Sequence, residues 1–195
     1  MKSKKNFISK NYSASWNYLK SSKNYIYFIM VLFFLFAVIG FFFPAPEGLS
    51  KAIILFIEKL VEKTKDLSGI GLISFIFLNN LQSCFIGFLL GFFLGIVPVL
   101  ICILNGYILG FVGNLAVEKS GPYVLWALLP HGIFELPAIF ISLGLGLRFG
   151  MFLFRKDLVE NLRESFIYGL KTFLLIVIPL LIIAAIIEGS LIAFF

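Results

Sequence analysis

The stretch Leu67–Val117, LSGIGLISFIFLNNLQSCFIGFLLGFFLGIVPVLICILNGYILGFVGNLAV, decides the fold of this chain. Its 51 consecutive residues include no Asp, Glu, Lys, Arg or His. A hydrocarbon core of about 30 Å takes roughly 20 apolar residues for each helical crossing. The stretch is therefore long enough for two membrane spans and the turn between them, and it predicts a protein embedded in a lipid bilayer.

The composition of the whole chain agrees with a membrane protein. Hydrophobic residues make up 61% of the sequence, charged residues 13%, and the mean hydropathy is +1.05. An ordinary globular protein has about twice that share of charged residues. With 195 residues, most of them in spans, we expect one membrane domain and no separate soluble catalytic domain. Cys84 and Cys102 both lie in the neutral stretch, where we expect small apolar side chains rather than a disulfide or a metal site.

The placement of the basic residues predicts the topology. Before the first apolar segment there are six lysines and no acid, namely Lys2, Lys4, Lys5, Lys10, Lys20 and Lys23. A second basic segment, with Arg148, Arg155, Lys156 and Arg163, precedes the last apolar segment. The positive-inside rule places both on the cytoplasmic side of the cell membrane, which five crossings allow. This topology accounts for the net charge of +6 without a nucleic acid as partner.

The predicted fold is an all-α, polytopic transmembrane helical bundle of about five spans. The spans are expected at about 25–43, 70–95, 97–117, 122–147 and 168–194. Residues 1–24 form a basic cytoplasmic or interfacial segment, and residues 25–195 form a single transmembrane domain. Ser50–Asp66 has apolar residues on one helical face and charged residues on another, so it is expected to lie on the outer interface, and Asn6–Lys23 is expected to meet lipid or partners. The uncharged turn near residues 95–98 is either a loop or a re-entrant break.

Glycines at four-residue spacing form smooth strips on two predicted spans. Such strips let another helix backbone approach closely. Two interpretations stay open, namely packing within the bundle and a dimer interface. The glycines are Gly87, Gly91 and Gly95 on the second span and Gly106 and Gly110 on the third.

The most specific local feature is LPHGIFELP at residues 129–137, where the only histidine of the chain precedes a glutamate by four residues. On a helix, His131 and Glu135 share a face. A charge at the bilayer centre costs at least about 2.5–3.5 kcal/mol on insertion scales. We therefore expect Glu135 to be protonated, paired with His131, or turned toward a wet interior.

The same motif predicts a break in the fourth span. Pro137 lacks the amide that would bond the carbonyl of Ile133, while Pro130 and Gly132 loosen the preceding turn. A broken helix with a free carbonyl beside an ionisable pair is the expected result.

Three interpretations of the His131 and Glu135 pair compete. It is a buried pair that fixes helix register, a proton, ion or solute site of the kind that transporters build at helix breaks, or a centre for metal-dependent catalysis. Zinc hydrolysis normally needs three protein ligands, whereas the chain has one His and no HExxH motif. There is also no Asp in the predicted spans and no GxSxG elbow. We therefore expect no enzyme, metal or cofactor.

The remaining polar side chains in the apolar segments are Asn79, Asn80, Gln82, Asn105 and Asn114. Asn79, Asn80 and Asn105 either form interhelical hydrogen bonds or gather around His131 and Glu135 as one polar core.

The run LPHGIFELPA at residues 129–138, with Asn79-Asn80, the Gly87/Gly91/Gly95 strip and Asn105-Gly106 before it, resembles the stage II sporulation protein M family. The resemblance covers about residues 79–150, and more loosely the whole chain. It implies a helical membrane protein whose sporulating bacterial members anchor peptidoglycan-degrading partners in the membrane during engulfment, with no established catalytic activity and no known cofactor.

Our leading hypothesis is a non-enzymatic integral membrane scaffold or organiser. It is expected to lie in the lipid bilayer as a homo-oligomer, a dimer in the simplest case, and to meet other membrane-associated proteins. The alternative is a transporter or channel for a proton, ion or small solute that uses His131 and Glu135 at the helix break.

Overall fold

The computed structural model describes the backbone of residues 2–43 and 45–194, and the side chains of residues 9–43, 45–126, 132–133 and 135–191. This described part is helical and contains no strand. Its α-helices are α1 (Lys2–Ser21), α2 (Lys23–Phe42), α3 (Glu47–Thr64), α4 (Ile70–Leu89), α5 (Ile96–Ser120), α6 (Val124–Gly150), α7 (Leu158–Thr172) and α8 (Ile178–Phe194). Two 3₁₀ turns, η1 (Leu90–Phe92) and η2 (Met151–Phe154), extend α4 and α6, and a π-helical turn, η3 (Phe173–Val177), joins α7 to α8.

Five helical segments of the described chain are long and apolar enough to cross a membrane, which confirms the predicted bundle. They are Lys23–Phe42, Ile70–Phe92, Ile96–Ser120, Glu135–Phe154 and Leu158–Leu191. The fifth begins ten residues earlier than predicted. Its first part, α7, carries charges on one side only and packs on α1 and α6, so the helix continues beyond the apolar stretch.

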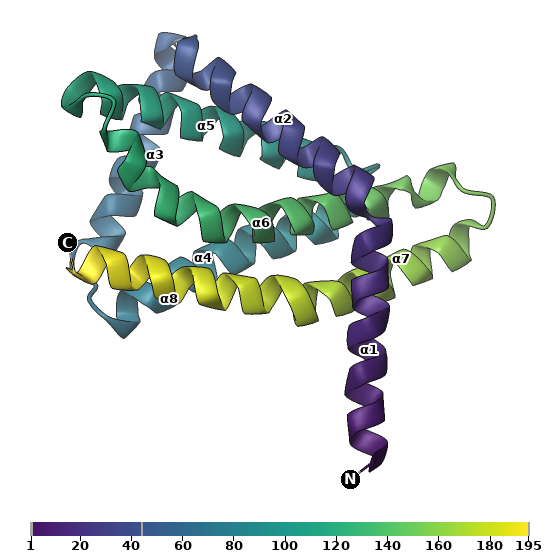
Figure 1. Ribbon diagram of the computed structural model, residues 1–195. Helices are drawn as coiled ribbons and strands as arrows, with labels where there is room; N and C mark the ends of the chain where they lie inside the picture. Colours follow the sequence, from purple (N-terminus) through teal and green to yellow (C-terminus); the bar gives the residue numbers. More distant parts are fainter. Residues whose placement is uncertain (1, 44, 195) are drawn as a thin grey trace.

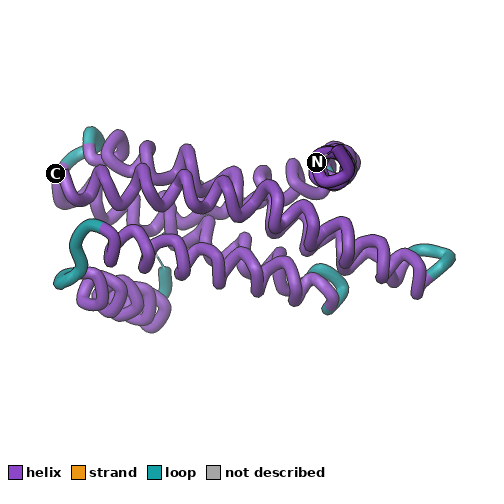
Figure 2. The backbone as a smooth tube through the Cα atoms, turned by 90° about the horizontal axis from the view of Figure 1, so that it is seen from below, coloured by secondary structure: helices purple, strands orange, loops and turns teal. Residues whose placement is uncertain are grey.

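The spans run side by side, and two other helices cross the ends of the bundle. Figure 1 shows the C-terminal part of α1 crossing the spans toward the end where the α6–α7 turn lies, its N-terminal part projecting beyond the bundle, and α3 crossing the opposite end near the C-terminus. In the view of Figure 2, α1 is seen end-on while the spans are seen from the side. The two predicted basic segments therefore lie at the same end of the bundle, which we call the basic end. The orientation of α1 and α3 across the spans is the one expected of interfacial helices.

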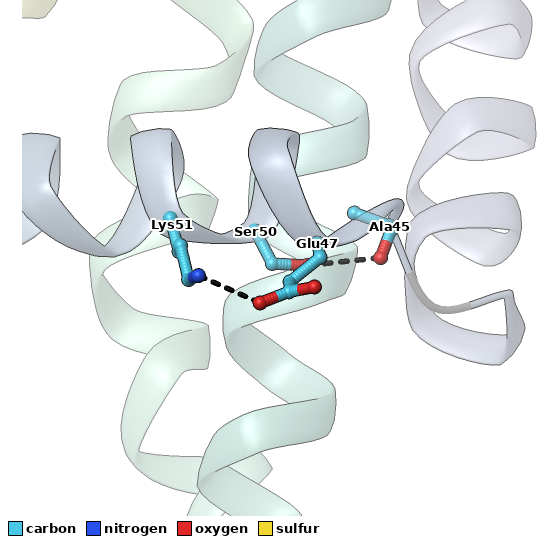
Figure 3. A network of polar contacts seen from close by, with 4 residues as sticks. All are labelled: Ala45, Glu47, Ser50 and Lys51. Atoms are coloured by element: carbon cyan, nitrogen blue, oxygen red, sulfur yellow. Dashed lines mark hydrogen bonds and ion pairs between the residues drawn. The ribbon is translucent and has the colours of Figure 1, made fainter.

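The entry into α3 is built from local contacts. Ser50 Oγ donates a hydrogen bond of 3.0 Å to the Ala45 carbonyl, and Lys51 Nζ forms an ion pair of 2.6 Å with Glu47 Oε1 (Figure 3). Glu47 lies in the first turn, where a negative charge favours the positive end of the helix dipole. Pro46 precedes that turn and has no amide to leave unpaired there.

The uncharged turn between the second and third spans is a short loop. Leu94 and Gly95 have positive φ angles of 56° and 70°, and they reverse the chain between η1 and α5. Pro98 is the third residue of α5. A proline in the first helical turn removes an amide that has no intrahelical acceptor, so it starts the helix without cost.

The predicted break in the fourth span is corrected by the structure. The α6 helix continues from Val124 to Gly150 through Pro130, Gly132 and Pro137. Figure 1 shows its N-terminal turns inclined to the remainder, so the helix bends without an interruption. Prolines are tolerated within membrane helices because local adjustments and neighbouring groups satisfy the carbonyl that each one frees.

The α6 helix is the centre of the bundle. One buried cluster joins it to α4 and α8 and contains Phe88, Ala138, Leu145, Val177 and Leu181 among others. A second cluster joins it to α2 and α5, and its members are Ile29, Phe33, Cys102, Phe140 and Leu143. Among the candidate spans, the described part of α6 from Glu135 onward has the largest share of buried residues.

Candidate functional site

Glu135 lies inside the bundle on the central helix. It is 8% exposed and begins a stripe of α6 that continues through Ala138, Ser142 and Leu145, all of them buried. This spacing of three and four residues defines one helical face. Ser142 Oγ donates a hydrogen bond of 2.6 Å to the carbonyl of Cys84 on α4. Ser142 therefore links α6 to α4 on the helical face that also carries Glu135.

The backbone of His131 lies one turn before Glu135 in α6, in agreement with the sequence spacing. The side chains of His131 and Pro130 lie outside the described residues. The pairing of His131 with Glu135 stays a prediction.

The structure divides the predicted asparagines between two environments. Asn80 is half-buried on α4, one turn before Cys84, whereas its neighbour Asn79 is exposed. Asn105 is exposed on α5, and its Nδ2 donates a hydrogen bond of 2.8 Å to the carbonyl of Ile101 in the same helix. Only Asn80 is placed on the side of α4 that carries Cys84.

The exposed side of α4 carries a polar cluster at the middle of the span. Gln82 and Ser83 are exposed as well as Asn79. The span runs from Ile70 to Phe92, so all three residues lie within two positions of its centre. We call Asn79, Gln82 and Ser83 the α4 amide face.

The predicted glycine strips lie inside the bundle. A methyl carbon placed on Gly91 would come within 3.0 Å of the backbone of Gly146 on α6. On α5, the same addition at Gly106 or Gly110 would meet the carbonyl of Phe33 or of Ala37 on α2 at less than 3.0 Å. Helices α4 and α6, and likewise α2 and α5, are therefore in backbone contact along these strips.

Two further glycines of the strip on the second span also contact α6. A methyl carbon on Gly87 would meet the side chain of Leu143, and one on Gly95 would meet that of Leu147, both within 3.0 Å. All five glycines named in the prediction thus face helices of the same chain. The contacts are those of packing within the bundle, and the strips are not free to meet a second copy.

An arginine site at the basic end was missed by the sequence reasoning. Arg148 Nη1 lies 3.1 Å from the carbonyl of Tyr18, 2.5 Å from Ser21 Oγ and 2.7 Å from Ser22 Oγ, and its two N–H groups are shared among these three acceptors. Its guanidinium carbon lies 3.9 Å from the centre of the Tyr18 ring. Burial raises the pKa of the Tyr18 phenol, and the Arg148 charge partly opposes that rise. The sequence features that could have indicated this site are Arg148 at the end of the fourth apolar segment and the pair Ser21-Ser22 before the first one.

Other contacts fix α1 to α7 at the same end. Tyr18 Oη donates a hydrogen bond of 3.3 Å to the carbonyl of Ser165. Thr172 Oγ1 donates its shorter hydrogen bond, 2.7 Å, to the carbonyl of Tyr168 in its own helical segment, and it lies 3.3 Å from the carbonyl of Ser15 on α1. The rings of Tyr18 and Tyr168 stack with their centres 5.9 Å apart. The interfacial helix α1 is thereby held against the bundle by side chains of α6 and α7.

The described side chains contain no group of three or more His, Cys, Asp or Glu residues that is placed to hold a metal ion.

The sequence profile of the family described as "Stage II sporulation protein M" matches residues 29–191. An uncharacterized protein of Methanocaldococcus jannaschii is 32% identical over 117 residues, which are 57% of this chain and 51% of that protein. The chain thus spans about half the length of this relative. No solved structure matches the chain.

Proposed function

Because this chain belongs to the stage II sporulation protein M family, we propose that it is a non-enzymatic membrane organiser that associates with itself and with other membrane-associated proteins. The observation that carries the proposal is the α4 amide face. Asn79 and Gln82 expose amides in the middle of a membrane span, where lipid cannot bond them. A protein partner with polar groups at the same depth can form the hydrogen bonds that lipid cannot.

The cost of leaving the amides in hydrocarbon is large. Transfer of an unpaired amide from water to an alkane costs roughly 4–8 kcal/mol. A hydrogen bond between membrane helices recovers part of this, on average about 0.6 kcal/mol relative to the separated helices. A neighbouring helix with polar groups at the same depth therefore stabilises the face, and several such bonds together favour association.

A second copy of the same face is the simplest partner. An amide carries both donors and an acceptor, so two identical faces related by a two-fold axis can bond each other. Gln82 lies 12 residues before the turn at Leu94 and Asn105 lies 11 residues after it, so Asn105 of α5 is placed at a similar depth. The glycine strips are covered by helices of the same chain, so they do not compete for this role.

Disulfide crosslinking in native membranes tests the self-association. Ser83→Cys is expected to give a dimer on oxidation, because Ser83 lies on the exposed α4 amide face. The matched control is Ile183→Cys, an exposed position in the middle of α8. The native Cys84 and Cys102 are buried and should not react. Equal crosslinking at both positions, or none at Ser83→Cys, would contradict the proposed interface.

A second measurement examines the amides directly. Asn79→Leu combined with Gln82→Leu removes the polar groups without burying new volume in the bundle, since both side chains are exposed. We expect the particle mass in mild detergent to fall from dimer to monomer. If the double variant keeps the particle mass of the unmodified protein, the two amides do not hold the dimer together.

The proposed orientation places the basic end in the cytoplasm of the cell. The positive-inside rule and the location of both basic segments at this end support it. A membrane-impermeant thiol reagent added to intact cells should therefore label Lys59→Cys in α3 and leave Lys10→Cys in α1 unlabelled. The reverse pattern would invert the topology.

Transport is a second candidate, favoured by the burial of Glu135 on the central helix. A carboxyl at this depth is costly unless it serves a site or a register contact. Proton or ion flux into proteoliposomes that Glu135→Gln abolishes, with the fold retained, would support this candidate. Absence of flux for all tested ions would leave the organiser role.

A further inference from the structure

A shallow, open groove of about 400 Å³ lies at the basic end between η1, α6 and α7. Its lining residues are Phe92, Phe149, Val159, Leu162, Arg163 and Phe166. The surface that they form is wholly apolar, so Arg163 contributes the carbon atoms of its side chain to the lining. We infer that this groove binds an anionic phospholipid, with an acyl chain between the phenylalanine rings and the phosphate against Arg163.

The walls of the groove are held in place by ring contacts. The ring of Phe149 lies 6.1 Å from that of Phe92 and 5.9 Å from that of Phe166. Behind them, the fully buried Phe88 stacks on Phe166 at 6.5 Å and on Phe173 at 5.9 Å. Because these rings are anchored in the core, the groove exists before a ligand enters, and binding need not order its walls.

The depth of the groove fits a lipid whose head group is at the membrane surface. Helix α1 lies across the spans, and Tyr18 of α1 bonds the carbonyl of Ser165, two residues from Arg163. On α1, Trp16 is exposed and Lys20 lies 5.7 Å from its ring, a combination typical of the head-group level. Arg163 is therefore placed near the head groups. Phe92 and Phe149 lie at the ends of their spans, where an acyl chain begins.

The charge at Arg163 favours an anion. The side chain is exposed, and within the described residues it forms no ion pair with Glu160 or Glu164. Glu160 and Glu164 flank Arg163 on the charged side of α7, while Val159, Leu162 and Phe166 form the adjoining apolar face. An arginine binds phosphate through two parallel hydrogen bonds, which a lysine cannot reproduce.

The surroundings add to this preference. Basic residues far outnumber acids at this end, and a positive surface of this kind attracts anionic lipids. The basic residues with described side chains are Lys10, Lys20, Lys23, Arg148, Arg155, Lys156, Arg163 and Lys171, and the acids are Asp157, Glu160 and Glu164. A phospholipid with net negative charge is therefore preferred over a zwitterionic one of the same chain length.

Lipid titration of the purified full-length protein, followed by native mass spectrometry in 150 mM salt, tests the site. The probes are phosphatidylglycerol and phosphatidylcholine with identical acyl chains. We expect Arg163→Gln to weaken phosphatidylglycerol binding about tenfold, because a charge-assisted contact is lost. The matched control Lys156→Gln lies at the same end but outside the groove lining, and it should change binding by less than about twofold.

A second measurement locates the acyl chain of the bound lipid. Phosphatidylglycerol with a photoreactive acyl tail should crosslink to the segments that contain Phe92, Phe149 and Phe166. Equal losses for Arg163→Gln and Lys156→Gln, or crosslinks confined to other spans, would overturn the inference. Disulfide dimers formed by Arg163→Cys would also overturn it, because they would place a second copy over the groove. The α4 amide face takes no part in these measurements, so their outcome is independent of self-association.

Discussion

Replacing Gly110 by alanine should push α5 away from α2. A methyl carbon there would lie less than 3.0 Å from the carbonyl of Ala37 and 2.8 Å from the backbone nitrogen of Phe41. Ordinary contacts of such a carbon begin at about 3.4 Å. Both neighbouring groups belong to the α2 backbone, so neither can rotate aside. The helices themselves must separate by several tenths of an ångström.

The expected cost follows from two opposing effects. Overpacking of a well-packed contact costs typically about 1–3 kcal/mol, and the loss falls at the upper end when backbone must move. Alanine regains up to about 1 kcal/mol through its higher helix propensity. We expect Gly110→Ala to lower the free energy of unfolding by about 2 kcal/mol, which is roughly a 30-fold change in the unfolding equilibrium.

Gly113→Ala on the same helix is the matched control. Its new methyl would have Leu125 Cδ2 and Phe41 Cδ2 as nearest atoms, both at 3.6 Å, an ordinary contact distance. Its stability should be unchanged or higher by up to about 1 kcal/mol. The two variants add the same atoms to the same helix, so their difference isolates the contact with α2.

Unfolding in mixed micelles of increasing dodecyl sulfate content, followed by circular dichroism, measures both variants. Ala37→Gly should not rescue Gly110→Ala, because the obstructing atom is a carbonyl oxygen and not a methyl group. Equal stability of Gly110→Ala and Gly113→Ala would refute the close approach of α2 and α5.

Three other changes test the remaining contacts. Gly87→Ala should destabilise the bundle by about 1–2 kcal/mol in the same assay, and Leu143→Ala should partly rescue it, because there the obstructing atom is the end of a side chain. Arg148→Gln should release α1 from the bundle, seen as at least tenfold faster amide hydrogen exchange at its C-terminal end, while the exchange of α8 stays unchanged. Ser142→Ala should lower the unfolding free energy by about 0.6–1.7 kcal/mol through loss of the bond to Cys84, with the exposed Ser83→Ala as the control that leaves it unchanged.

The spans were predictable because charge and proline mark their ends. The neutral stretch Leu67–Val117 was divided within a few residues of the observed turn, since few other places in it favour a reversal. The start of the fifth span was placed too late because α7 alternates charged and apolar residues, which lowers its hydropathy without ending the helix. Pro179 lies just beyond η3, and its missing amide accounts for the widened turn. A single proline within an apolar segment does not by itself indicate whether the helix bends, widens or ends there.

The polar site was less predictable because it depends on how each helix is rotated. Asn79 and Asn80 are neighbours in sequence, yet they point about 100° apart on a helix. One is exposed and the other lies on the Cys84 side of α4. Which of the two faces inward is set by the glycines that bring α4 against α6. Residue types alone do not indicate which of the two asparagines faces the bundle and which is exposed.

The buried glycines and the exposed amides of α4 connect the fold to the proposed organiser role. Its inward side uses Gly87 and Gly91, whose contacts with α6 need no polar groups, while its outward side carries Asn79 and Gln82. The bundle is therefore packed without these amides. In lipid, an outward amide adds nothing to the stability of the single chain and is a cost until another helix covers it. The glycines that pack α4 on α6 are buried and the amides that we propose for association are exposed, so the two sets are different residues of one helix and each can be changed separately.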